Sequence, residues 1–273
     1  MQILHNDEPL RLWKTYNLNV PYAGFARLGR DWKEDKVCSP FSRIYYTVHG
    51  EGMIHLPDRD IPLLEGKVYL IPAGLFFSYD CDNYMEQLFF HVNLTHKNGI
   101  DLFRNCKQIY VRDASPQEME SILMLYQSEN IADAFRLKSV LFQELADFMA
   151  MAGLGEVQSR NYSPLVEQMF LLAQNPVSAG HHINELAEKL HVSTSTLSKR
   201  FRQETGMAPR EYLEQLVISR ACTLLLADEL SIADVAEELG FTDQFYFAKY
   251  FKKQMHVSPS GYRRQMKMTG KGD

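Results

Sequence analysis

Hydrophobic residues in about the last hundred positions recur every three or four residues, and this pattern occurs twice. The spacing is typical of a helix with one buried side. The second copy, in segment 232–242, follows the first, in segment 183–193, by 49 positions. The apolar residues of the two copies are Ile183, Leu186 and Leu190, and Ile232, Val235 and Leu239. The repeat predicts two copies of one helical unit.

Each copy continues into a turn and a second helix. A small residue, Ala187 or Ala236, lies where a second helix would cross the first. The second copy has Gly240 in its turn, which adopts a positive φ without strain, whereas the first copy has His191, which does not. The second helix of each copy has two apolar residues four positions apart that would pack inward: Leu197 and Phe201, and Phe247 and Phe251.

The opposite side of each second helix carries polar and aromatic residues. Lys and Arg contact phosphates and guanine, Gln contacts adenine, and hydroxyl groups contact either base type, while an aromatic ring contacts the methyl group of thymine. We therefore predict double-stranded DNA as a partner. The predicted contacts are Ser195, Thr196, Ser198, Lys199 and Arg202 in the first copy, and Gln244, Phe245, Tyr246, Lys249 and Lys253 in the second.

The alternative is a helical bundle over 164–267 in which the repeat only reflects core packing. Basic clusters at 199–202, 249–253 and 263–267 favour the DNA interpretation. A bundle held together by packing alone has no need of a basic cluster at each repeat.

The segment between the two copies, 209–226, is predicted to be one helix. Pro209 would lie in its first turn, and apolar residues follow at helical spacing. At 1.5 Å per residue the helix would be about 27 Å long. Successive major grooves on one face of DNA lie about 34 Å apart. One rigid helix could therefore hold both units in adjacent grooves.

The stretch 231–253, followed by Ser258-Pro259 and Tyr262-Arg263, resembles the signature of the AraC/XylS-type transcriptional regulators. The resemblance covers about a hundred residues at the carboxyl end. It departs from the family at His256, where Gly is usual, and this affects the expected shape of the last turn. The resemblance implies a pair of DNA-contacting units on one linker helix, with base contacts near the start of each second helix. It also implies activation of transcription, with RNA polymerase as a further partner.

Length and charge fit two domains. A chain of 273 residues has room for two cores. The net charge is −5, but residues 163–273 carry thirteen basic and thirteen acidic residues, so the excess acid belongs to the front part. The DNA-contacting part is neutral overall, and we expect its specificity to come from clustered charge.

The front part alternates short apolar segments with turns at intervals of about ten residues, which predicts an antiparallel β-sandwich or β-barrel. The whole chain is thus expected to be α+β: a cupin-like or jelly-roll-like barrel with helices after it, and then an all-α domain of two tandem helix-turn-helix units. Gly66, Pro72 and Gly74 resemble the second cupin motif. The predicted strands are Arg43–Val48, Met53–Leu56, Ile61–Leu64, Lys67–Ile71 and Glu86–Leu94, with a turn at 49–52.

A cupin resemblance raises the possibility of a metal-dependent enzyme. Such sites use a His-x-His pair and a later His, but this chain has no His-x-His, and Phe77 stands at the later position. We therefore predict no metal, no cofactor and no catalytic residue. A metal-free cupin enzyme fused to a DNA-binding module stays open as a rival.

The barrel is expected to bind a small-molecule effector instead. Gln87, Phe89 and His91 alternate along one strand and so face the same side. By resemblance to the sugar-responsive branch of the family, Phe89 would stack on a carbohydrate with Gln87 and Tyr79 as polar neighbours. Arg27 and Tyr46 are further candidates. Two alternatives remain: these residues only fill the core, or the barrel only dimerises.

Two helices are predicted after the barrel, at 115–126 and 131–152. The second has an apolar stripe opposite Asp133, Arg136, Glu144 and Asp147. By resemblance to the family these helices imply a homodimer; the stripe could also simply cover the barrel. Residues 153–164 lack periodicity and are the expected linker between a sensing domain, 1–152, and a DNA-binding domain, 165–273.

The chain has no leader-like segment and no run of eighteen apolar residues. Its four cysteines show no zinc-binding or disulfide spacing, which fits reduced thiols. We expect a cytoplasmic protein without a membrane partner.

Overall fold

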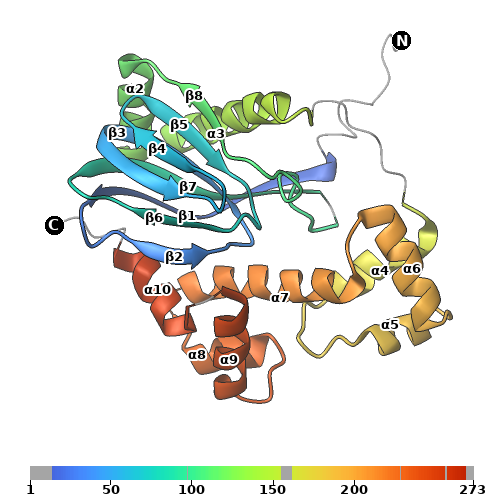
Figure 1. Ribbon diagram of the computed structural model, residues 1–273. Helices are drawn as coiled ribbons and strands as arrows, with labels where there is room; N and C mark the ends of the chain where they lie inside the picture. Colours follow the sequence, from blue (N-terminus) through green and yellow to red (C-terminus); the bar gives the residue numbers. More distant parts are fainter. Residues whose placement is uncertain (1–13, 97, 155–161, 228, 256, 269–273) are drawn as a thin grey trace, which may run out of the picture.

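A computed structural model describes residues 14–96, 98–154, 162–227, 229–255 and 257–268 (Figure 1). Its front part is a sheet domain with two helices after it, and its carboxyl part is helical. The strands are β1 (Tyr16–Leu28), β2 (Glu34–Val37), β3 (Ser42–His55), β4 (Asp60–Leu64), β5 (Lys67–Ile71), β6 (Phe77–Asp80), β7 (Met85–His96) and β8 (Tyr110–Asp113). Every strand pair is antiparallel.

The sheet is open, which corrects the prediction of a closed barrel. Its eight strands follow the order β1-β7-β3-β5-β8, with β4 and β6 paired to the second half of β3, and β2 paired to β6. Among the described residues, β1 and β8 form the two ends of this path and do not pair with each other. The prediction of antiparallel strands is confirmed. Whether a sheet closes into a barrel depends on whether its two edge strands pair, and the alternation of apolar segments and turns along the chain does not determine this.

The predicted turn at 49–52 is wrong, because β3 continues through it. Gly50 has φ +73°, and the pairing of β3 with β7 shifts register between Thr47 and His49. A Cβ atom at Gly50 would lie 2.1 Å from the backbone oxygen of Tyr84. Glycine here makes a bulge that bends the strand, so that β3 pairs with β5 and β7 before the bend and mainly with β4 and β6 after it.

Helices α2 (Pro116–Gln127) and α3 (Ile131–Met151) form close to the predicted positions. Ser115 caps α2, and Asn130 caps α3. Leu141, Leu145 and Phe148 of α3 are buried against one face of the sheet. These contacts explain why the helix lies on the sheet.

The expectation that Glu144 faces solvent is wrong. Its carboxylate is buried and accepts hydrogen bonds from the guanidinium of Arg112, one of them at 2.9 Å from Nε. Arg112 lies on β8 and also pairs with Glu118 of α2. A buried carboxylate is tolerated because this cation compensates its charge.

The carboxyl part consists of seven further helices over the described residues: α4 (Pro164–Gln174), α5 (Ile183–Lys189), α6 (Thr194–Thr205), α7 (Pro209–Leu226), α8 (Ile232–Glu238), α9 (Gln244–Met255) and α10 (Pro259–Met268). The α7 bounds are those predicted, and the helix is continuous. Its first half packs in one core with α4, α5 and α6. Its second half packs in another core with α8, α9 and α10. Helix α7 is therefore the structural link between the two helical units.

The sheet domain rests on α7 (Figure 1). The hydroxyl of Tyr212 donates a hydrogen bond to the Asn98 carbonyl at 2.5 Å, and Arg104 forms an ion pair with Glu211 at 3.0 Å. Phe41, which precedes β3, is buried in the core of the second helical unit. Most of the predicted linker, residues 155–161, lies outside the described residues.

Candidate functional site

The first exposed surface is formed by α5 and α6. His191 in the turn between them has φ +57°, the strained conformation that the sequence suggested. The hydroxyl of Ser193 caps α6 by accepting from the Thr196 backbone nitrogen at 3.1 Å. Leu197 and Phe201 are fully buried. The turn and the cap thus orient α6 so that the side opposite Leu197 and Phe201 is exposed to solvent.

The second surface is formed by α8 and α9 in the same way. Gly240 has φ +73° in the turn, and Ser231 and Asp234 form a capping box at the start of α8. One carboxylate oxygen of Asp243 accepts from the backbone nitrogens of Phe245 and Tyr246, each at 2.8 Å. This bond pattern fixes the start of α9, where the predicted contacts lie.

The ten predicted DNA contacts all lie on α6 or α9, and nine of them are exposed; Ser198 is half-buried. The exposed fractions of Phe245 and Tyr246 are 72% and 57%, which is unusual for side chains with this much apolar surface. Within the described part of the chain, no ion pair engages Lys199, Arg202, Lys249 or Lys253. These cations are available for phosphates. The predicted departure at His256 lies outside the described residues.

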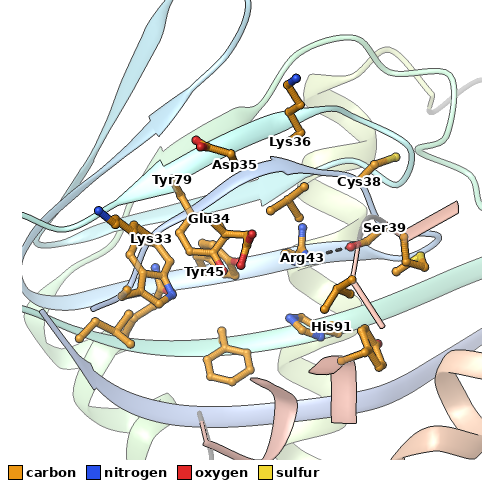
Figure 2. A pocket seen from close by; sticks show the side chains of 18 of the residues that line it. Lys33, Glu34, Asp35, Lys36, Cys38, Ser39, Arg43, Tyr45, Tyr79 and His91 are labelled. Atoms are coloured by element: carbon orange, nitrogen blue, oxygen red, sulfur yellow. Dashed lines mark hydrogen bonds between the residues drawn. The ribbon is translucent and has the colours of Figure 1, made fainter. Parts of the chain in front are cut away.

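A pocket of about 260 Å³ lies between the sheet domain and the second helical unit (Figure 2). Side chains from β3, β6, β7 and the segment around β2 form most of its wall. The carboxyl part contributes Met255, Val257 and Tyr262 from the end of α9 and the start of α10. A molecule in this pocket would therefore touch both halves of the chain.

Four of the six predicted ligand contacts line the pocket: Tyr79, Gln87, Phe89 and His91. The alternation on β7 is as predicted. The other two candidates lie elsewhere. Arg27 is exposed and pairs with Glu86 at 2.9 Å, and Tyr46 is buried on the opposite face of the sheet. Neighbouring Tyr45 lines the pocket instead, because successive strand residues face opposite sides.

The pocket contains buried polar groups with few partners. Arg43 is 6% exposed, and its Nη2 donates to the Ser39 hydroxyl at 2.7 Å (Figure 2). Gln87 Nε2 and His91 Nδ1 are buried without a hydrogen-bond partner in the described structure. Burial, with a smaller contribution from the Arg43 charge, holds the pKa of His91 well below its usual value, so the ring is neutral at pH 7.

Aromatic rings surround these groups. Trp32 stacks on Tyr79 with ring centroids 4.2 Å apart, and Phe41 stacks on His91 at 4.5 Å. Burial raises the pKa of Tyr79, so its hydroxyl stays protonated and can donate or accept a hydrogen bond. Aromatic faces with a few polar groups are typical of sites for small organic molecules.

Sequence reasoning missed several pocket residues. Arg43 is the one charged residue of the predicted strand Arg43–Val48, and it alternates in phase with Tyr45. A charge at an inward position is unusual, so this signal could have identified it. No comparable sequence feature marks Met255, Val257 and Tyr262 as pocket residues. They reach the pocket only through the packing of the second helical unit against the sheet.

No group of three or more His, Cys, Asp or Glu that could hold a metal ion occurs among the described residues. Cys38, Cys81, Cys106 and Cys222 are free thiols. Over the same residues, every helix is too short or too polar to cross a bilayer.

Comparison with known families places the carboxyl part. Residues 186–265 match a family model described as a helix-turn-helix domain. The matched segment begins within α5 and contains the whole of α6 and α9, which carry the predicted DNA contacts.

Similar proteins extend over most of the chain. The Msm operon regulatory protein of Streptococcus mutans is 23% identical, over 92% of this chain and 94% of that protein. The lactose operon transcription activator of Staphylococcus xylosus is 21% identical, over 95% and 99%. The transcriptional activator RhaR of Pectobacterium atrosepticum is 38% identical over 33% of this chain and 31% of its own length.

The fold is similar to that of ToxT from Vibrio cholerae. One ToxT structure superposes with a TM-score of 0.59 at 14% identity, covering 94% of this chain and all of that one. A ToxT structure with a bound unsaturated fatty acid gives a TM-score of 0.57 at 16% identity, covering 94% and 98%. These likenesses support the two-part architecture: an antiparallel sheet domain, its helices, and a helical carboxyl part.

Proposed function

This chain is a DNA-binding transcriptional regulator with an AraC/XylS-type helix-turn-helix domain, and we propose that it contacts its operator with both helix pairs at once. The observation that carries this proposal is the pair of exposed faces on α6 and α9, each with cations that have no ion-pair partner in the described structure. Helix α7 belongs to both cores, so it would hold the two faces at a fixed separation. At about 27 Å it is long enough to place them in neighbouring major grooves.

Lys199 and Lys249 are expected to contact phosphates of the operator. Lys199→Ala or Lys249→Ala should weaken operator binding and make the slope of log K against log salt less steep by about one unit, because a lysine at a phosphate releases counterions. Fluorescence anisotropy of the labelled operator at several salt concentrations measures this slope. Arg59→Ala removes an exposed charge from the far sheet domain and serves as the control. Equal slopes in all variants would contradict the proposal.

The proposed effector site is the pocket between the halves. A small molecule there would touch Phe89 of the sheet and Tyr262 of α10, so its binding would depend on how the two halves are arranged. A ligand with different affinity for two arrangements shifts the balance between them. One relative is named a lactose operon transcription activator, which supports a carbohydrate as effector and activation of sugar-utilisation genes as outcome.

The proposed whole is a cytoplasmic homodimer whose sensing domain is 1–152, whose linker is 153–164 and whose DNA-binding domain is 165–273. RNA polymerase would be its partner in activation. The exposed apolar residues Ile131, Phe135 and Phe142 on α3 support the dimer. A cupin-like fold of the sheet domain, suggested by Gly66 and Pro72, also stays a prediction.

Two rivals make different predictions. A cupin enzyme fused to the DNA-binding part would turn over a substrate, and the named relatives, which are transcription regulators, favour no catalysis. A sheet domain that only dimerises would leave DNA occupancy unchanged by any small molecule. The pocket between the halves favours the sensing proposal over this second rival.

A further inference from the structure

Arg43 is a buried cation for which the described residues provide no counter-ion. Its guanidinium lies 5.3 Å from the Phe41 ring centroid and 5.1 Å from that of Phe77, and one of its five N–H donors is used by Ser39. In the described chain no carboxylate is recorded within ion-pair distance of it. Burial of an unpaired charge is unfavourable. The two aromatic rings offset part of this cost, and a ligand that carries a negative charge would offset more of it.

Two neighbouring polar groups also have no hydrogen-bond partner within the described structure. In the sheet, Arg43 is directly opposite His91, whose buried Nδ1 has no partner among the described residues and donates or accepts according to the tautomer of the ring. Gln87 Nε2, a donor, has no partner among them either and lies four residues further along the same strand. A ligand that complements Gln87 and Arg43 needs hydrogen-bond acceptors, and at Arg43 a negative charge gives the strongest bond.

An aromatic platform separates the two polar positions. Tyr45 and Phe89 are paired across β3 and β7, between the Arg43–His91 pair and the Thr47–Gln87 pair. Side chains on one face of a strand repeat every two residues, or about 7 Å. The wall thus offers, in order, a cationic position, an aromatic platform about 7 Å away, and an amide donor about 7 Å beyond it.

The acidic residues of the pocket do not occupy the cationic position. Asp31, Glu34 and Asp35 line the pocket but are exposed, as are Lys33 and Lys36 next to them. Charges at the rim are screened by solvent, whereas Arg43 is not. The buried part of the pocket is therefore positive.

We propose that the effector is an anion, whose carboxylate or phosphate group pairs with Arg43 and whose body stacks on Phe89 and Tyr45. This inference rests on the proposed effector role of the pocket. It narrows the carbohydrate class to acidic or phosphorylated members. It also admits a non-sugar carboxylic acid of similar length, since the Arg43 contact is the same. Neutral sugars would leave the buried charge unpaired and would bind weakly.

The test is a comparison of matched neutral and anionic probes by thermal unfolding of the full chain. The pairs are galactose with galacturonate, glucose with glucose 6-phosphate, and 1-octanol with octanoate. At least one anionic member should raise Tm where its neutral partner does not. Arg43→Gln should weaken that binding about 10- to 100-fold, as expected for loss of a charge-assisted hydrogen bond. Arg59→Gln, the same change in an exposed side chain remote from the pocket, should bind like the unmodified chain.

The preference for anionic probes in the unmodified chain tests the inference even if Arg43→Gln fails to fold. If no anionic probe stabilises the chain more than its neutral partner, the inference is overturned. Neutral binding that is lost in Phe89→Ala but kept in Arg43→Gln would overturn the anion inference and leave the effector site intact. An anionic probe that binds equally to Arg43→Gln and the unmodified chain would overturn it as well. Binding of none of the six probes, with DNA occupancy unchanged by any of them, would count against the effector proposal too.

Discussion

At the scale of single residues, local rules predicted which side chains share a face. Alternation along β7 placed Gln87, Phe89 and His91 together, and all three line the pocket. The same rule, applied across β3, would have selected Tyr45 and Arg43 rather than Tyr46. One wall of the pocket could therefore be predicted from the sequence. Tyr262 could not, because it lies in the carboxyl part and reaches the pocket only through tertiary packing.

The backbone conformation of the two turn residues also follows a local rule. His191 and Gly240 occupy equivalent positions with φ of +57° and +73°. A side chain in this conformation costs about 1 to 2 kcal/mol, partly offset by the lower unfolded-state entropy of a non-glycine residue. His191→Gly should therefore raise the free energy of unfolding by about 0.5 to 1 kcal/mol.

The reciprocal change should do the opposite. Gly240→Ala would place a Cβ atom 2.5 Å from the Ser178 hydroxyl, in addition to the backbone strain. Urea denaturation followed by circular dichroism measures both variants. A loss of stability in His191→Gly would show that the histidine side chain makes a contact worth more than the strain.

At the scale of elements, helices were easier to predict than strands. Helix α7 has the predicted bounds because Pro209 favours its start and its apolar spacing is regular. The turn predicted at 49–52 failed because Gly50 permits a bulge as readily as a turn, and only the partner strands decide between them. Glu144 was misplaced because its partner, Arg112, comes from β8.

Helix α3 has two apolar faces where the sequence suggested one stripe. Leu141, Leu145 and Phe148 are buried against the sheet, whereas Ile131 and Phe135 are 77% and 70% exposed. An exposed face of this kind supports contact with a second copy of the chain. The expected mass in solution is twice the chain mass of 31.6 kDa.

Size-exclusion chromatography with light scattering measures this mass. The double variant Ile131→Asp, Phe135→Asp should return the single-chain mass, because two charges would be buried in the contact. Leu171→Asp changes an exposed apolar residue on α4 and should leave the dimer intact. A single-chain mass for the unmodified protein would disprove the dimer.

At the scale of the whole molecule, the arrangement of the two halves was beyond sequence reasoning. Helix α7 contributes to both helical cores and also contacts the sheet domain through Tyr212 and Glu211. The pocket is lined from both sides because the second helical unit, with Met255, Val257 and Tyr262, lies against the sheet. Periodicity identified the helices, but the residues that join the halves are separated by more than a hundred positions, as Asn98 and Tyr212 are.

The central claim, two DNA contacts at a fixed separation, can be tested without knowledge of the operator. The full chain is used to select binding sites from a random pool of duplexes, and the selected sites are sequenced. Because α7 fixes the distance between α6 and α9, the sites should contain two conserved blocks about 10 base pairs apart, centre to centre. In Gln244→Ala one block should lose its sequence preference while the other keeps it. A single conserved block, or two blocks at variable spacing, would contradict the account.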